Sequence, residues 1–272
     1  MKLQKVNVRY GPPLQTMIGN LEANGPALAK AVNHKHFRRV TGLNFSEKIV
    51  RVLRDVYVSS VPEPIVGRIR GARKNGVFRQ AGVVFVHVPR SAGTSFCQAL
   101  YGGFLGHLTI NNVLKSASPD VLALPRFAIV RNPWDRAVSA YHYALGGGGI
   151  EGIVRIRHPA TYRKPEFESF ERFVTDWLAH KNLVKLDVVF QPQSFYVRAA
   201  DGSMPFDHIG RFEDINQTVT WLQGALPGFS GVQHTNSSRR SEYAGYYTPK
   251  TRDLIARLYA EDIKLFGYTF EE

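Results

Sequence analysis

The sequence has a single cysteine, Cys97, so no intramolecular disulfide can form and no cysteine-rich zinc site can be built. No stretch reaches the roughly 18 consecutive apolar residues that a membrane-spanning helix needs. Acidic residues are also scarce, because 22 Asp and Glu stand against 35 Lys and Arg, a formal net charge of +13. This excess of positive charge predicts an anionic partner: a nucleic acid, a membrane surface, an acidic glycan or a phosphorylated cofactor.

The positive charge is concentrated in residues 1–80, which contain 15 Lys and Arg but 4 Asp and Glu. Residues 46–58 carry apolar side chains at helical spacing, which predicts a basic, partly helical N-terminal segment. This segment either packs on the rest of the chain as a solvated appendage or offers a basic surface to anionic lipid or polysaccharide. Because the N-terminus lacks the apolar core of a secretory signal, we expect a cytoplasmic protein, with peripheral contact at the inner face of the membrane left open.

Residues 81–272 have the pattern of an α/β domain. The apolar run 83–88 is typical of a parallel strand that is buried on both faces, and further strands are expected at 127–130, 187–190 and 208–212. Helical spacing of apolar residues between and after these strands predicts a parallel sheet flanked by helices. The helical patterns cover 134–141, 170–178 and 254–259.

The first of two anion-binding motifs, HVPRSAGTSF at 87–96, follows the first strand directly. A strand, a turn of small residues and a helix start leave backbone N–H groups that attract an anion, which gives the fold a P-loop-like site. The Lys of a Walker A sequence is absent, which disfavours an ATP- or GTP-hydrolysing loop and leaves an ordinary βα turn as the alternative. The candidate ligands are Arg90, Ser91, Ala92, Gly93, Thr94 and Ser95.

The second motif is RFAIVRNPWDRAVSAYHY at 126–143. Arg131 follows the second strand at its carboxyl end, where open α/β sheets bind ligands. Asn132 and Pro133 are favoured as the N-cap and the first residue of a helix. Ser139 lies about two turns into that helix and could share a phosphate with Arg131. The alternatives are a structural ion pair for Arg131 and a plain surface position for Ser139.

Together the two motifs resemble the donor-binding signatures of carbohydrate sulfotransferases, in particular the branch related to heparan sulfate 2-O-sulfotransferase and its bacterial relatives. The resemblance implies that the first motif holds the 5′-phosphosulfate of PAPS (3′-phosphoadenosine 5′-phosphosulfate), and that Arg131 and Ser139 hold the 3′-phosphate. Where this chain has Arg90, the family usually has a Lys that contacts the bridging oxygen of the leaving phosphate. The resemblance covers 82–272 and continues at 191–193, 209–213, 234–238 and 259–268.

Transfer of a sulfuryl group to a hydroxyl requires a base, and imidazole suits this task because its ordinary pKa is about 6.5. The resemblance implies this role for His107, with a packed loop histidine as the alternative, and Arg90 would stabilise the leaving group. The rival bases are His87, His142 and Glu213. The candidate residues for acceptor binding are Arg211, Glu213, Asn236, Ser238 and Arg240.

The sequence therefore predicts a PAPS-dependent sulfotransferase that acts on a carbohydrate or glycolipid hydroxyl by in-line displacement, without a metal. Two alternatives stay open. A small-molecule kinase with a variant phosphate loop would require ATP and Mg²⁺, whereas a non-catalytic module for acidic glycans would bind with a steep salt dependence. Nucleic acid is not expected as a partner, because no recognised nucleic-acid-binding signature is present.

Overall fold

The computed structural model describes residues 74–148, 159–232 and 243–271. The basic segment 1–73, with its predicted helix at 46–58, lies outside the described residues. Within the described ranges no helix is long and apolar enough to cross a membrane. The first described helix, α5 (Asn75–Ala81), buries Phe78 against β1 and so belongs to the folded unit, although it precedes the boundary expected at residue 81.

The sheet consists of three parallel strands in the order β1-β2-β3. These strands are β1 (Val84–Val86), β2 (Arg126–Val130) and β3 (His208–Arg211). The register pairs Phe85 with Phe127 and Phe127 with His208, so the carboxyl ends of the strands meet at one edge. Three of the four expected strands are therefore confirmed, and the first motif and Arg131 each follow a strand at that edge.

The strand expected at 187–190 is wrong, because these residues form a turn in which the Phe190 N–H donates to the Asp187 carbonyl at 2.9 Å. Val189 and Phe190 are buried in an aromatic cluster away from the sheet, where Phe190 lies 5.3 Å from the Trp177 ring centre. A short apolar run in a sequence predicts that its residues are buried. Burial alone does not distinguish a strand from a packed turn, which is why the prediction failed here.

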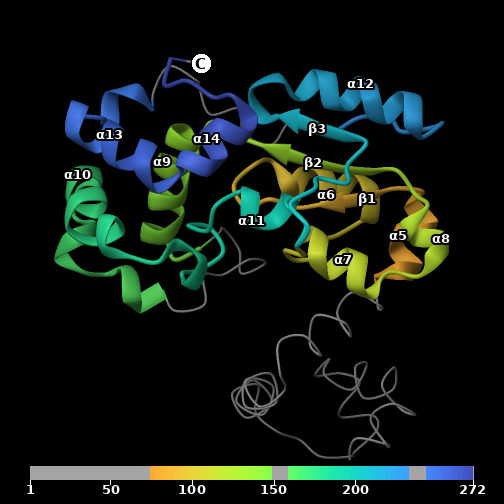
Figure 1. The fold of residues 1–272 in the computed structure, drawn as a ribbon, viewed down its shortest axis with the longest axis horizontal. Coiled ribbons are helices and arrows are strands. Elements are labelled where there is room, and N and C mark those ends of the chain that lie inside the picture. The colour runs from red at the N-terminus through yellow and green to blue at the C-terminus, as the bar shows by residue number, and fades with distance from the viewer. Residues whose placement is uncertain (1–73, 149–158, 233–242, 272) are drawn as a thin grey trace, which may run out of the picture. The chain divides into compact units, whose positions relative to one another are not determined.

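Helices cover both faces of the sheet (Figure 1). On one face α6 (Gly93–Tyr101) and α12 (Ile215–Ala225) pack against Phe85 and Phe127. Cys97 is buried in this layer as a small packed side chain. The other face is covered by α5 together with α7 (Ile110–Ser116), α8 (Pro119–Leu122) and α11 (Ser194–Val197).

A second, largely helical layer is built around α9 (Pro133–Leu145), the helix that starts at the second motif. Its core is aromatic, and the predicted helices over 134–141, 170–178 and 254–259 all contribute to it. The 170–178 segment is helical but irregular, because it changes from α to π to 3₁₀ geometry. The remaining elements are η1 (Pro159–Tyr162), η2 (Pro165–Phe167), α10 (Phe170–Arg172), η3 (Phe173–Trp177), η4 (Leu178–His180), η5 (Leu183–Lys185), η6 (Phe212–Asp214), η8 (Ala244–Tyr246), α13 (Pro249–Leu258) and α14 (Ala260–Phe266).

Candidate active site

The first motif forms a tight loop between β1 and α6. Arg90 and Ala92 have φ angles of 69° and 56°, in the left-handed region that residues other than glycine seldom adopt. Ala92 is also the N-cap of α6 and provides no side chain to cap the helix. The first turn of α6 therefore keeps backbone N–H groups without a capping side chain, at the positive end of the helix dipole.

Two arginines of the second motif hold the backbone of this loop. Arg136 Nε donates to the Pro89 carbonyl at 2.9 Å, and Arg131 Nη1 donates to the Arg90 carbonyl at 3.1 Å. Arg136 is 1% exposed and also donates from Nη2 to the Gln191 carbonyl at 2.7 Å. Because strained backbone persists only where its surroundings fix it, the two motifs form one structural unit.

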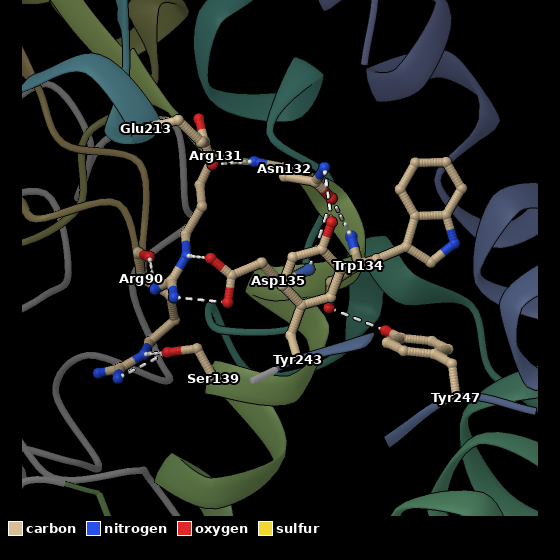
Figure 2. Close-up of polar contacts among 9 residues, drawn as sticks. All are labelled: Arg90, Arg131, Asn132, Trp134, Asp135, Ser139, Glu213, Tyr243 and Tyr247. Carbon is tan, nitrogen blue, oxygen red and sulfur yellow. Dashed lines mark hydrogen bonds and ion pairs between the residues drawn. The ribbon is translucent and has the colours of Figure 1, made fainter. Parts of the chain in front are cut away.

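The start of α9 has the geometry that the sequence predicts. Asn132 is the N-cap, its side-chain oxygen accepts from the Trp134 N–H at 3.0 Å, and Pro133 is the first helical residue. The Asn132 N–H donates to Glu213 Oε1 at 2.8 Å, and its side-chain amide donates to the Thr269 carbonyl at 2.8 Å. This cap ties the end of β2 to the end of β3 and to the C-terminal segment, as Figure 2 shows for Asn132 and Glu213.

Arg131 forms a bidentate ion pair with Asp135, which lies one turn further along α9. Its Nε and Nη2 atoms donate to the two carboxylate oxygens at 2.8 Å each (Figure 2). The guanidinium also lies over the Phe212 ring, 4.2 Å from its centre, and the residue is 5% exposed. The ion pair that the sequence left open as an alternative for Arg131 is therefore present.

Arg90 contacts Ser139, the residue that the sequence grouped with Arg131. Its Nε and Nη2 donate to Ser139 Oγ at 3.1 and 2.9 Å, and its guanidinium lies 4.5 Å from the centre of the Tyr143 ring (Figure 2 for the serine contact). Burial and the nearby charge of Arg131 lower the pKa of Arg90 to about 10. Arg90 thus remains charged at neutral pH but in a costly position for a cation.

The other candidate ligands of the first motif differ in accessibility. Ser91 is buried and its hydroxyl lies 3.5 Å from Gln193 Oε1, whereas Thr94 is exposed and Ser95 half-buried. Gly93 is buried against His87, and a Cβ atom at this position would lie 1.7 Å from the imidazole Cδ2. Close packing against His87 therefore requires glycine at this position.

Gln193 links the two motifs, although the sequence indicated it only as part of a supporting segment. Its side-chain oxygen accepts from the Arg131 N–H and its amide donates to the Arg131 carbonyl, both at 2.8 Å. Its own N–H donates to Asp262 Oδ2 on α14 at 2.7 Å. Gln193 and Asp262 are fully buried. Buried polar side chains are normally hydrogen-bonded, and here these bonds hold the backbone of Arg131 in place.

His107 lies beside the first motif, in the loop after α6. Its Nδ1 is 3.2 Å from the His87 carbonyl, which can only accept, so Nδ1 carries the proton and Nε2 is the basic atom of the neutral ring. The ring lies 4.4 Å from that of His87, which itself packs on Gly93. Burial, with the charges of Lys74 and Arg136, lowers the pKa of His107 to about 4, although the His87 contact opposes this shift.

The family model described as "Sulfotransferase family" matches residues 76–269, more than half of the chain. The chain belongs to the sulfotransferase family. Comparisons with curated proteins and with solved structures gave no match. The matched range contains both motifs, the loop with His107 and the buried network that joins them.

The rival bases of this sulfotransferase are engaged elsewhere or inaccessible. His87 is 5% exposed, and burial lowers its pKa well below the ordinary value. His142 Nε2 lies 2.9 Å from the Tyr246 hydroxyl. Both oxygens of Glu213 accept hydrogen bonds, from the Asn132 N–H and, at 2.9 Å, from the Tyr268 hydroxyl. Of the candidate bases, His107 is thus the one best placed beside the first motif.

The residues expected to bind the acceptor divide into two groups. Arg211 donates to the Phe266 carbonyl at 2.6 Å and stacks on Tyr268, so it shares with Glu213 the task of holding the C-terminal segment of the sulfotransferase. Asn236, Ser238 and Arg240 lie outside the described residues. Within the described ranges no group of three or more His, Cys, Asp and Glu is arranged to hold a metal ion.

Proposed function

We propose that this protein transfers a sulfuryl group from PAPS to a hydroxyl of a carbohydrate or glycolipid, as in the branch related to heparan sulfate 2-O-sulfotransferase. The observation that supports this most is the convergence of three features on one edge of the sheet. These are the uncapped start of α6, the charged Arg90 and the neutral imidazole of His107. Sulfotransferases generally use PAPS, and a helix N-terminus with a nearby cation suits its phosphate groups.

The charge balance around the first motif also fits an anionic donor. Arg90, Arg131 and Arg136 lie close enough for each of the latter two to lower the pKa of Arg90. Asp135 is paired with Arg131, and among the described residues no carboxylate forms an ion pair with Arg90. A bound phosphate would supply the missing negative charge, because an opposite charge at short range favours the ionised guanidinium.

The proposed reaction is an in-line displacement at sulfur. His107 Nε2 accepts the proton of the acceptor hydroxyl while the bond between that oxygen and sulfur forms. The bond between sulfur and the bridging oxygen of the leaving phosphate breaks, and its electron pair remains on the 3′,5′-bisphosphate product. Arg90 and the first N–H groups of α6 stabilise this developing negative charge, and the His87 carbonyl holds the imidazole in the required tautomer.

Binding of nucleotides to the full chain tests the donor. Isothermal titration calorimetry with 3′,5′-ADP, ADP and ATP, each with and without Mg²⁺, should give the tightest binding for 3′,5′-ADP, independent of Mg²⁺. A Mg²⁺-dependent preference for ATP would instead identify a kinase. Absence of nucleotide binding, together with steeply salt-dependent binding of an acidic glycan, would identify a non-catalytic binding module.

A variant of the base tests the mechanism. His107→Ala should abolish release of 3′,5′-ADP from PAPS in the presence of a saccharide acceptor panel, while the affinity for 3′,5′-ADP stays nearly unchanged. The matched control is His180→Ala, because His180 is exposed at the end of η4. If the His107 variant loses bisphosphate affinity in proportion to turnover, the residue is structural and the base assignment is wrong.

A further inference from the structure

The turn at 187–190, which the sequence predicts as a strand, lies beside the first motif. Arg136 joins the two, because its Nε donates to the Pro89 carbonyl at 2.9 Å and its Nη2 donates to the carbonyl of Gln191, directly after the turn, at 2.7 Å. Arg136 is buried, so this link belongs to the folded core. The turn therefore has a fixed place relative to the loop that carries the proposed donor site.

The same turn also lies close to the proposed base. The Tyr196 hydroxyl is 3.3 Å from the Val188 carbonyl, and the Tyr196 ring centre is 6.3 Å from that of His107. The Val188 side chain is exposed, so the turn reaches the surface at this point. In the proposed reaction the acceptor hydroxyl must approach His107. A polar group on this turn is therefore placed to meet another part of the acceptor.

Asp187 is the charged side chain of the turn. It is half-buried, and its Oδ2 accepts a hydrogen bond from the hydroxyl of the buried Tyr162. Among the described residues, no donor contacts Oδ1 and no Lys or Arg forms an ion pair with this carboxylate. A carboxylate has about four lone-pair sites for hydrogen bonds. Asp187 thus keeps the capacity to accept hydrogen bonds from the hydroxyl groups of a ligand.

Tyr143 lies between Asp187 and the cation of the first motif. Burial raises the pKa of Tyr143, and the charge of Asp187 adds to this shift while Arg90 opposes it. The Tyr143 ring centre is 4.5 Å from the Arg90 guanidinium. A negative charge therefore lies next to the cations that suit the phosphate groups of the donor. Such a charge disfavours a second anion in the same place.

We propose that Asp187 contacts the acceptor saccharide and selects sugars without a negative charge next to the reacting hydroxyl. Its carboxylate accepts hydrogen bonds from neutral hydroxyl groups and repels a uronate or a sulfate ester. Tyr162 holds the carboxylate in position. The inference rests on the proposed transfer to a carbohydrate and names the class of its acceptor. Heparan sulfate, the acceptor named in the related branch, is acidic, so the specificity proposed for this chain differs from that of the branch.

Matched pairs of acceptors measure this preference in a kinetic assay of the full chain with PAPS. Each pair consists of the methyl glycoside of glucose, galactose or mannose and that of the corresponding uronic acid, which differ only at C6. Asp187→Asn removes the charge and keeps an oxygen that accepts from Tyr162. The wild-type protein should have the higher kcat/KM for the neutral sugar. The variant should reduce this preference by about tenfold, the effect of one charge-assisted hydrogen bond.

A titration with KCl adds a readout that a structural role of Asp187 would not change. Because salt screens charges, the preference of the wild-type protein for the neutral sugar should fall as the KCl concentration rises. In Asp187→Asn the remaining preference should depend little on KCl.

Two control variants separate the charge from the fold. Tyr162→Phe removes the buried hydrogen bond and keeps the carboxylate, so it should retain the preference for neutral sugars. Any loss of stability in this variant should affect both sugars of a pair equally. Asp253→Asn removes the same charge from an exposed position on α13 and should leave the preference unchanged.

Three outcomes would contradict the proposals in distinguishable ways. If Asp187→Asn leaves the preference unchanged, or lowers kcat/KM equally for both sugars of a pair, Asp187 is structural and this inference is wrong. A wild-type protein that binds 3′,5′-ADP but transfers to no neutral acceptor would also overturn this inference alone. A wild-type protein that neither binds 3′,5′-ADP nor consumes PAPS would overturn the proposed function as well.

Discussion

Substitution of Gly93 by Ala separates two reasons for a glycine at the start of α6. The added Cβ would lie 1.7 Å from His87 Cδ2 and 1.9 Å from Nε2, inside the imidazole ring. His87 is 5% exposed, so its ring has little room to move aside. The φ angle of Gly93 is outside the left-handed region, so an Ala would meet no backbone penalty there. The three nearest atoms that the Cβ would meet all belong to the His87 ring, so the cost is one of overpacking against this side chain.

Overpacking of a buried site costs about 1–3 kcal/mol, and an overlap as deep as this one belongs at the upper end, about 3 kcal/mol. The structure predicts that removal of the ring abolishes the cost. In a His87→Ala background, Gly93→Ala should be neutral or stabilise the protein by up to about 1 kcal/mol, because Ala is the better helix former. The double variant should thus be no less stable than His87→Ala alone.

Urea unfolding of the full chain, followed by tryptophan fluorescence, gives the four free energies of this cycle. The control is Gly224→Ala on α12, where a Cβ would meet nothing within 4 Å. Gly224→Ala should stabilise the protein slightly by the same helix propensity. Additive losses in the Gly93/His87 cycle would refute the reasoning, because they would mean that the glycine is required by something other than the imidazole.

Two further predictions concern charge. Asp135→Asn breaks the buried pair with Arg131 and should lower the free energy of unfolding by about 3 kcal/mol, with part of the loss recovered by 3′,5′-ADP. The exposed Asp253→Asn control should cost less than about 1 kcal/mol, and equal effects in a urea titration would contradict the assignment. The pKa of His107, lowered to about 4 mainly by burial, predicts a ring that is neutral at pH 7 and takes up its proton only near pH 4. Since this pKa lies below the ordinary value of about 6.5, the stability that His107 confers is lost as the pH falls between these values. An NMR titration of the imidazole, assigned with His107→Gln, checks this, and a midpoint near the ordinary value would contradict the expected shift.

Elements with strong local signals were predictable from the sequence. The Asn132–Pro133 pair fixed the start of α9, because an N-cap side chain and a preset φ act within a few residues. The strand before the first motif followed from a nearly continuous apolar run. The turn at 187–190 was mistaken for a strand because its apolar residues face an aromatic cluster, and that cluster brings together segments distant in the sequence.

The partner of Ser139 could not be predicted for a different reason. The sequence placed Arg131 and Ser139 on one strand–helix unit, which made them the natural pair. The direction of the Arg90 side chain depends on a left-handed backbone conformation. In a sequence such a conformation is indicated mainly by glycine, and this position holds an arginine. The contact of Arg90 with Ser139 is therefore a property of the folded loop and not of either motif alone.

The buried polar network explains how a loop with two strained residues persists. Each such residue costs on the order of 1–3 kcal/mol, so the loop around Arg90 and Ala92 requires compensation. Arg136 and Arg131 supply it through the Pro89 and Arg90 carbonyls.

The guanidinium groups that hold this loop are held in turn from outside the motif. Gln193 fixes the backbone of Arg131, and Asp262 on α14 fixes Gln193 and helps to balance the charge of Arg136. For the proposed anionic donor, such a site has its cations already oriented, so binding would need little reorganisation. Such a site needs only a few cationic side chains. This is consistent with the near balance of 20 basic and 18 acidic residues in 81–272. The large net charge of the chain therefore resides mainly in residues 1–80.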